Sequence, residues 1–153
     1  MQDSKTRGSK FPQGGQARGG FNQPTSVKDW MRNNPLSTEW ITKEADSAMV
    51  DYTEKAGQFM AKNGLTNSKI RSIYGEIKRI QMGSFETEKA SFLLLRPKVA
   101  YAYGRDDRNK GLELFKEIFD TTSVQVTNQK SFINFSNFFE AILAYHKAYG
   151  GRD

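Results

Sequence analysis

Few residues in this chain have the types and spacing that catalysis requires. The only histidine, His146, lies among Phe and Tyr residues at helical spacing, which favours a buried structural imidazole over a general base. Asp106 and Asp107 are adjacent, and adjacent side chains on a helix do not face each other, so helix capping explains them better than metal binding. The sequence contains no cysteine and no histidine pair at zinc-binding spacing. We therefore expect no catalytic residue, no metal and no cofactor, and a chain that is not an enzyme. An enzyme that uses His146 is the rival hypothesis, and it requires an exposed imidazole.

Basic side chains, by contrast, gather on two neighbouring segments, residues 69–79 and 96–105. The net charge of +6 favours a polyanionic partner, most commonly nucleic acid, over an ordinary basic protein. Lys and Arg that contact phosphates bind a nucleic-acid backbone without reading its sequence. Gly75 lies between the basic residues of the first segment. It either lets a phosphate backbone approach closely, or it is an ordinary surface glycine or a close helix contact.

Helical periodicity positions the first basic segment. Residues 67–81 place their isoleucines and Tyr74 on one face, and Thr66 precedes them as an N-cap. Arg71 and Lys78 are seven residues apart and point away from that face together. The segment therefore predicts an amphipathic helix with its basic side exposed.

The second basic segment follows a predicted helix break. A helix capped by Ser84 is expected to be buried on most sides, because apolar residues that include Leu93 and Leu94 surround its axis. Pro97 is expected to interrupt it and to start a short helix over residues 98–103. Such a break would place Arg96 and Lys98 beside unpaired amides and Arg105 past the far end, as in an anion site.

The remaining pattern predicts an all-α fold, a compact bundle of about five helices. Residues 131–149 place their aromatic side chains on one arc of about 160°, which indicates the central helix of a bundle. Helical periods also appear at 27–33, from 37 to a stop at Asn63-Gly64 with a possible second start at Asp46, and from a cap at Asp107 or Asn109 to about 121. Residues 122–130 are expected to form a loop.

The first 24 residues differ in composition from the rest. They are rich in Gly and Gln with few large apolar side chains, which predicts a disordered tail at 1–24 and a helical bundle domain at 25–153. The triplet Arg18-Gly19-Gly20 is either part of a solvated linker or a loose RNA contact. No signal peptide or membrane-spanning run is visible, so we expect a cytoplasmic protein without membrane contact.

Three ordered stretches resemble the motifs of one protein family. Residues 65–71 followed by 76–80 resemble the helix-opening motif of the small subunit of type III-A CRISPR–Cas effector complexes (the Csm complex). Residues 95–105 are similar to its second motif, a leucine–basic–Pro–Lys run that ends in Gly-Arg. Residues 138–151 resemble its C-terminal signature. Together the three stretches cover residues 65–151.

The resemblance implies a non-catalytic, all-helical subunit of an antiviral defence ribonucleoprotein. Several copies would stack along the guide RNA–target RNA duplex, and its partners would be both RNAs, the other subunits of the complex and further copies of itself. The matched basic residues would contact RNA: Lys69, Arg71, Lys78, Arg79, Arg96, Lys98 and Arg105. Two alternatives stay open, a helical protein-interaction adaptor without direct nucleic-acid contact and the small subunit of the type III-B complex.

Overall fold

The computed structural model describes residues 26–153, and the predicted tail at 1–24 lies outside them. The described residues contain eight helical segments and no strand. Three helices are short: α2 (Val27–Asn33), α3 (Glu39–Thr42) and α6 (Lys89–Leu93). Five have ten or more residues: α4 (Ser47–Lys62), α5 (Asn67–Met82), α7 (Leu95–Gly104), α8 (Lys110–Ser123) and α9 (Gln129–Ala148). The predicted all-α fold with about five main helices is confirmed for this part of the chain.

The chain divides into two compact units after Asn33. In the first unit the described part is Ser26 and α2, which forms over the predicted residues. The Asp29 amide donates a hydrogen bond to Ser26 Oγ at 3.0 Å, and Asp29 pairs with Arg32 at 2.6 Å. The second unit, residues 34–153, holds α3 to α9 and all seven predicted RNA-binding residues.

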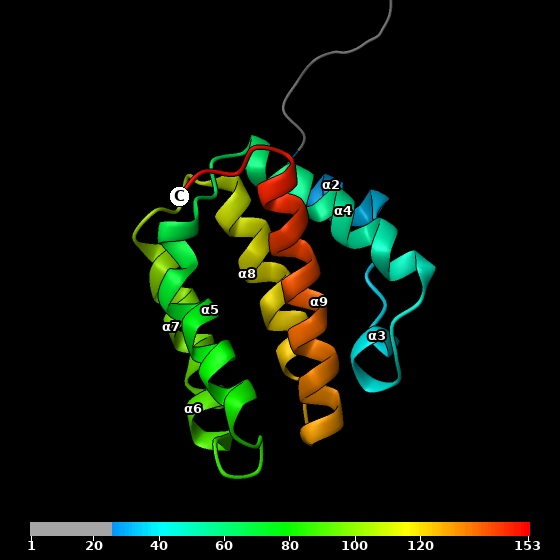
Figure 1. The fold of residues 1–153 in the computed structure, drawn as a ribbon. Helices are drawn as coiled ribbons and strands as arrows, with labels where there is room; N and C mark the ends of the chain where they lie inside the picture. The colour runs from blue at the N-terminus through cyan, green and yellow to red at the C-terminus, as the bar shows by residue number, and fades with distance from the viewer. Residues whose placement is uncertain (1–25) are drawn as a thin grey trace, which may run out of the picture. The chain divides into compact units, whose positions relative to one another are not determined.

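Helix α9 is the central helix of the second unit. It packs against α3, α4 and α5, and Figure 1 shows it (orange to red) between α4 and the α5 to α8 side of the bundle. The ring centroids of Phe135 and Phe139 are 4.8 Å apart. Phe139 lies 5.4 Å from Phe115 of α8, and Phe135 lies 5.2 Å from Phe92 of α6. The phenylalanines of the predicted aromatic arc therefore form the bundle core, where each ring removes roughly 150–250 Å² from water, whereas Tyr149 at the end of the arc is 39% exposed.

Side-chain caps set where α4 and α8 begin, whereas the predicted cap Thr66 of α5 forms no side-chain cap hydrogen bond. Asp46 accepts a hydrogen bond from the Met49 amide at 2.9 Å, so the periodic stretch that begins near Ser37 forms two helices, α3 and α4. Gly64 has a φ of +93°, which confirms the predicted left-handed stop after α4. Of the two candidate caps for α8, Asn109 is the one used, since its Oδ1 accepts from the Leu112 amide at 2.9 Å.

The segment that begins at Ser84 differs from the prediction. Ser84 accepts a hydrogen bond from the Thr87 amide at 3.3 Å and closes a turn, and the helix α6 begins only at Lys89. Leu93 and Leu94 are 56% and 60% exposed, so the expectation that this segment is buried on most sides is wrong. Phe92 and Leu95 are buried on either side of these two leucines, so the apolar run is divided between the core and the surface where α6 ends at Leu93.

The break between α6 and α7 lies earlier than predicted. Helix α7 begins at Leu95, and Pro97 lies inside its first turn, where a missing amide donor costs no helical hydrogen bond. Helix α8 likewise continues to Ser123, past the predicted end near 121. The loop predicted at 122–130 is thus shorter, because Gln129 already begins α9 behind the cap Asn128.

The C-terminal residues fold back beside the start of α5, an arrangement that the sequence did not predict. Thr66 and Arg152 form an isolated parallel bridge, and the Asn67 amide donates to the Arg152 carbonyl oxygen at 2.8 Å. The side chain of Asn67 donates to Asp153 at 3.0 Å. No helix in residues 26–153 is both long enough and apolar enough to cross a membrane.

Candidate nucleic-acid interface

Two grooves run along α5, one on each side. The α5/α7 groove has a volume of about 800 Å³ and includes the residues Lys69, Ser72, Pro97, Lys98, Tyr101 and Arg105. The α5/α9 groove has a volume of about 570 Å³ and includes the residues Arg71, Tyr74, Gly75, Glu140, Lys147 and Asp153. Four of the seven predicted residues thus line a groove, three of them the same one.

The α5/α7 groove has the more strongly basic lining. Lys69, Lys98 and Arg105 line it, and no Asp or Glu is among the described residues that do. Neither Lys98 nor Arg105 forms an ion pair with any residue of 26–153. Glu76 of α5 interacts electrostatically with Lys98 without direct contact. A phosphate could therefore approach Lys98 and Arg105 without having to displace a bonded carboxylate.

Lys69 is the exception in this groove, because its ammonium is already engaged. It lies 3.2 Å from Asp106 Oδ2, and Asp106 also accepts a hydrogen bond from Asn109 Nδ2 at 3.0 Å. The Asn109 hydrogen bond, followed by that of Lys69, lowers the pKa of Asp106 below its usual value. Asp106 therefore acts as a local anion that a phosphate would have to compete with for Lys69.

The α5/α9 groove is mixed in charge. Arg71 and Lys147 share it with Glu140 and Asp153. Lys78 lies 2.7 Å from Glu140, and that hydrogen bond raises the pKa of Lys78. Arg71 forms no ion pair with a described residue. Of the two grooves, the α5/α7 groove is accordingly the better match for a phosphate backbone.

Gly75 lies on the open side of α5. A Cβ at this position would meet no atom within 4 Å among the described residues. A close helix contact, one of the interpretations that the sequence left open, is therefore excluded within this part of the chain. The glycine lines the α5/α9 groove, so an ordinary surface position and a place of close phosphate approach both remain consistent with it.

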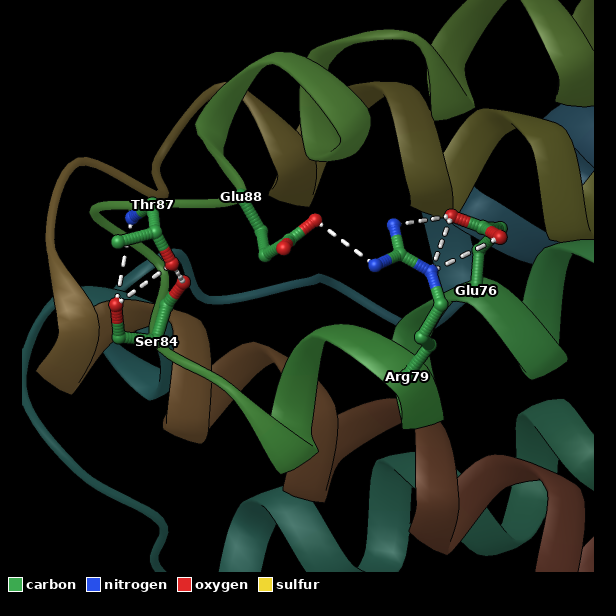
Figure 2. A network of polar contacts seen from close by, with 5 residues as sticks. All are labelled: Glu76, Arg79, Ser84, Thr87 and Glu88. Atoms are coloured by element: carbon green, nitrogen blue, oxygen red, sulfur yellow. Dashed lines mark hydrogen bonds and ion pairs between the residues drawn. The ribbon is translucent and has the colours of Figure 1, made fainter.

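Lys78, Arg79 and Arg96 line neither groove. Arg79 pairs with Glu76 at 2.9 Å and with Glu88 at 2.9 Å, so its guanidinium joins α5 to the residue before α6 (Figure 2). The hydrogen bond from Arg79 lowers the pKa of Glu76. Arg96 is exposed on α7 and forms no ion pair with any described residue. The predicted set is therefore not one patch.

The residues that could suggest catalysis or metal binding are placed elsewhere. His146 is fully buried, and its Nε2 lies 2.7 Å from the Leu65 carbonyl oxygen, which confirms the expectation of a core imidazole. Asp106 and Asp107 precede α8, where Asp106 bonds to the cap Asn109. No cluster of three or more metal-ligating side chains occurs within residues 26–153.

The comparison with protein families decides which interpretation of this surface applies. Residues 43–152, well over half of the chain, match the family described as Csm2 Type III-A. The chain belongs to this Csm2 family. It is accordingly a subunit of the type III-A Csm complex, associated with the other Csm subunits. The comparisons with curated proteins and with solved structures give no match.

The Csm2 match covers α4 to α9, the α5/α7 groove, and the α5/α9 groove except Asp153. The family resemblance of the sequence is thereby confirmed, and the type III-A assignment replaces the type III-B alternative. All seven predicted residues lie inside the matched stretch, although their contact with RNA stays a prediction.

Sequence reasoning missed one prominent side chain of the α5/α7 groove. Tyr101 is 66% exposed and the guanidinium carbon of Arg105 lies 5.7 Å from the centre of its ring. The signal was present, because Tyr101 and Arg105 are four residues apart and share a helix face. The short helix predicted over residues 98–103 contained Tyr101, but Arg105 was placed past its end, so the pairing of the two side chains was not predicted.

Proposed function

We propose that the chain is a non-catalytic, RNA-binding architectural subunit of the type III-A interference complex. In this role it holds guide and target RNA in the cytoplasm through phosphate contacts, and several copies stack along the guide RNA–target RNA duplex. Family membership supports the assignment to the complex. The RNA contact, the stacking and the absence of catalysis are the parts that we add.

The α5/α7 groove is the observation that carries the proposal. Lys98 and Arg105 lie on the same groove wall and form no direct ion pair within residues 26–153, and Lys69 adds a third cation across from them on α5. Phosphate contacts of this kind supply affinity that does not depend on base sequence. A subunit that follows a guide of any sequence requires binding of that type.

Two further observations support the other parts of the proposal. The imidazole of His146 is fully buried, so it lacks the access to substrate that a general base needs. The exposed side chains of Leu93 and Leu94 at the α6–α7 junction favour contact with another protein surface, such as a neighbouring copy or another Csm subunit.

The alternative function is an adaptor that holds other subunits together without touching RNA. The exposed leucines favour this function as well, and the basic groove would then face an acidic protein surface. The two functions differ in what holds the subunit in the Csm complex. An RNA-binding subunit loses retention when RNA is removed, whereas an adaptor stays assembled.

The experiment combines both tests on the assembled complex. The tagged complex is purified with wild-type chain or with Arg71→Ala/Arg105→Ala, and the RNA bound to each is measured at several salt concentrations. In a second arm the wild-type complex is treated with ribonuclease, and the fraction of the chain that stays in the complex is measured. We expect loss of bound RNA and a flatter salt dependence in the double variant, with an unchanged melting temperature. RNA retention equal to wild type would refute the assignment of these two residues. Full retention of the subunit after ribonuclease treatment would favour the adaptor.

A further inference from the structure

The α5/α7 groove contains an aromatic side chain that phosphate binding does not require. Tyr101 lines the groove and keeps 66% of its surface exposed, although α7 has a buried face on which Leu95 and Val99 are fully covered. An exposed tyrosine alone is a common surface feature. The distinctive feature here is that this ring lies among the groove's cations.

The cations lie at the spacings that bring side chains together on one helix. Lys98 precedes Tyr101 by three residues and Arg105 follows it by four, so all three project from one side of α7. The guanidinium carbon of Arg105 lies 5.7 Å from the ring centre, within the range of a cation–π contact. Lys69 faces them from α5 at the same groove.

This combination matches one kind of ligand. A flat π-rich group can stack on the ring and on the guanidinium plane, while Lys98 and Lys69 attract an anionic group beside it. A nucleotide carries both features in one unit. A cationic or purely apolar partner fits less well, because it would face three positive charges or leave them buried without partners.

We propose that Tyr101 is a stacking platform for an unpaired nucleobase, and that Lys98 and Arg105 hold the phosphates on either side of it. A base inside a duplex is already stacked on both faces, so only an unpaired or extruded nucleotide offers a free face to this ring. The groove thus takes a single-stranded segment of RNA or a nucleotide extruded from the guide RNA–target RNA duplex. This inference rests on the proposed RNA-binding function and adds the form of RNA that the groove takes.

The test compares three RNAs on wild type and on two variants of Tyr101, one without the aromatic ring and one with it. The full chain is titrated with a single-stranded RNA, the same RNA carrying abasic nucleotides, and a duplex of equal length. Tyr101→Leu keeps an apolar side chain but removes the aromatic ring, and Tyr101→Phe keeps the ring. Because Tyr101 is exposed, both variants are expected to melt at the wild-type temperature.

We expect Tyr101→Leu to bind the single strand about tenfold more weakly, as for removal of a base–aromatic stack. Tyr101→Phe should stay within about twofold of wild type, and both variants should bind the duplex within about twofold of wild type. Abasic RNA should bind wild type as weakly as intact RNA binds Tyr101→Leu. The stacking inference would be overturned if Tyr101→Leu bound the single strand as tightly as wild type does, or if it weakened binding of the single strand and of the duplex equally. Either result would leave the proposed RNA-binding function standing. A wild-type chain that binds neither form would overturn the proposed function itself.

Discussion

The Nε2 of His146 donates a hydrogen bond to the carbonyl oxygen of Leu65, 2.7 Å away. A carbonyl only accepts, so the proton lies on Nε2, and Nδ1 has no hydrogen-bond partner within residues 26–153. Gly151 lies against the same ring, and its amide donates to the His146 carbonyl oxygen at 2.7 Å. One imidazole thereby joins the end of α9, the C-terminal residues and the loop that starts α5. It fixes the position of the helix that carries Lys69 and Arg71.

Replacing this imidazole should destabilise the fold. In His146→Phe the ring volume remains, but the buried Leu65 carbonyl loses its donor, which costs about 1–3 kcal/mol. Chemical denaturation of wild type and variant measures the difference in the free energy of unfolding. His146→Gln offers the matched control, since its amide can still donate. Unfolding of His146→Phe at the wild-type denaturant concentration would show that the hydrogen bond carries no net stability.

Two glycines should respond to alanine in opposite directions. A Cβ on Gly151 would overlap the His146 ring, so Gly151→Ala should lower the free energy of unfolding by about 1–3 kcal/mol. Gly75 has open space around it in the middle of α5, so Gly75→Ala should raise that free energy by about 1 kcal/mol. Thermal melts of the two single variants test both signs. A stabilised Gly151→Ala would mean that the C-terminal residues do not pack on His146.

The Lys69–Asp106 pair predicts a pH dependence of stability. The pKa of Asp106 is lower in the folded chain than its usual 3.8, because Asn109 and Lys69 bond to its carboxylate. A lowered folded pKa contributes stability that is complete well above pH 3.8 and is lost as the pH falls through the folded value. Asp106→Asn should therefore be less stable than wild type at pH 7, and the difference should shrink as the pH falls below 3.8 and through the folded pKa.

Urea denaturation at a series of pH values measures this difference. Asp107→Asn is the control, since the adjacent Asp107 forms no ion pair with a described residue. A stability difference between Asp106→Asn and wild type that stays constant as the pH falls from 7 to well below 3.8 would contradict the role of the carboxylate.

Arg79 should act on the structure more than on RNA. Its guanidinium bonds to Glu76 and Glu88 (Figure 2), so Arg79→Ala should speed amide hydrogen exchange in residues 83–88. RNA affinity should change less than in Lys98→Ala, whose ammonium has no ion-pair partner in the described chain. Hydrogen-exchange mass spectrometry and RNA titration of both variants compare the two effects. An equal decrease of RNA affinity in both would place Arg79 at the RNA after all.

Patterns within single helices made much of the fold predictable. The aromatic arc of α9 predicted the central helix, and the amphipathic period of α5 predicted the exposed basic side that carries Arg71 and Lys78. Gly64 predicted a helix stop, which its positive φ confirms. These features depend on the spacing of a few side chains, which the sequence displays directly.

Contacts between distant segments were not predictable in the same way. The pairing of Lys78 with Glu140 joins residues far apart in the chain, and nothing near either residue signals it. The bridge from Thr66 to Arg152 is of the same kind. Leu93 and Leu94 were predicted to be buried but are exposed, because composition does not show which side of a short helix faces solvent. Four of the seven predicted basic residues lie in two separate grooves, and Arg79 instead pairs with Glu76 and Glu88. Predicting this arrangement would have required knowledge of the contacts between distant segments.

The salt dependence of RNA binding by Lys98→Ala/Arg105→Ala tests the central claim most directly. The control is Lys55→Ala/Lys62→Ala, which removes two exposed lysines of α4 that form no ion pair with a described residue and line neither groove. If the α5/α7 groove holds phosphates, the slope of log affinity against log salt should become shallower by about 0.7 for each phosphate of single-stranded RNA that the variant no longer neutralises. The control slope should change by much less. Equal slopes for the groove variant and the control would contradict the proposal that this groove binds the RNA backbone.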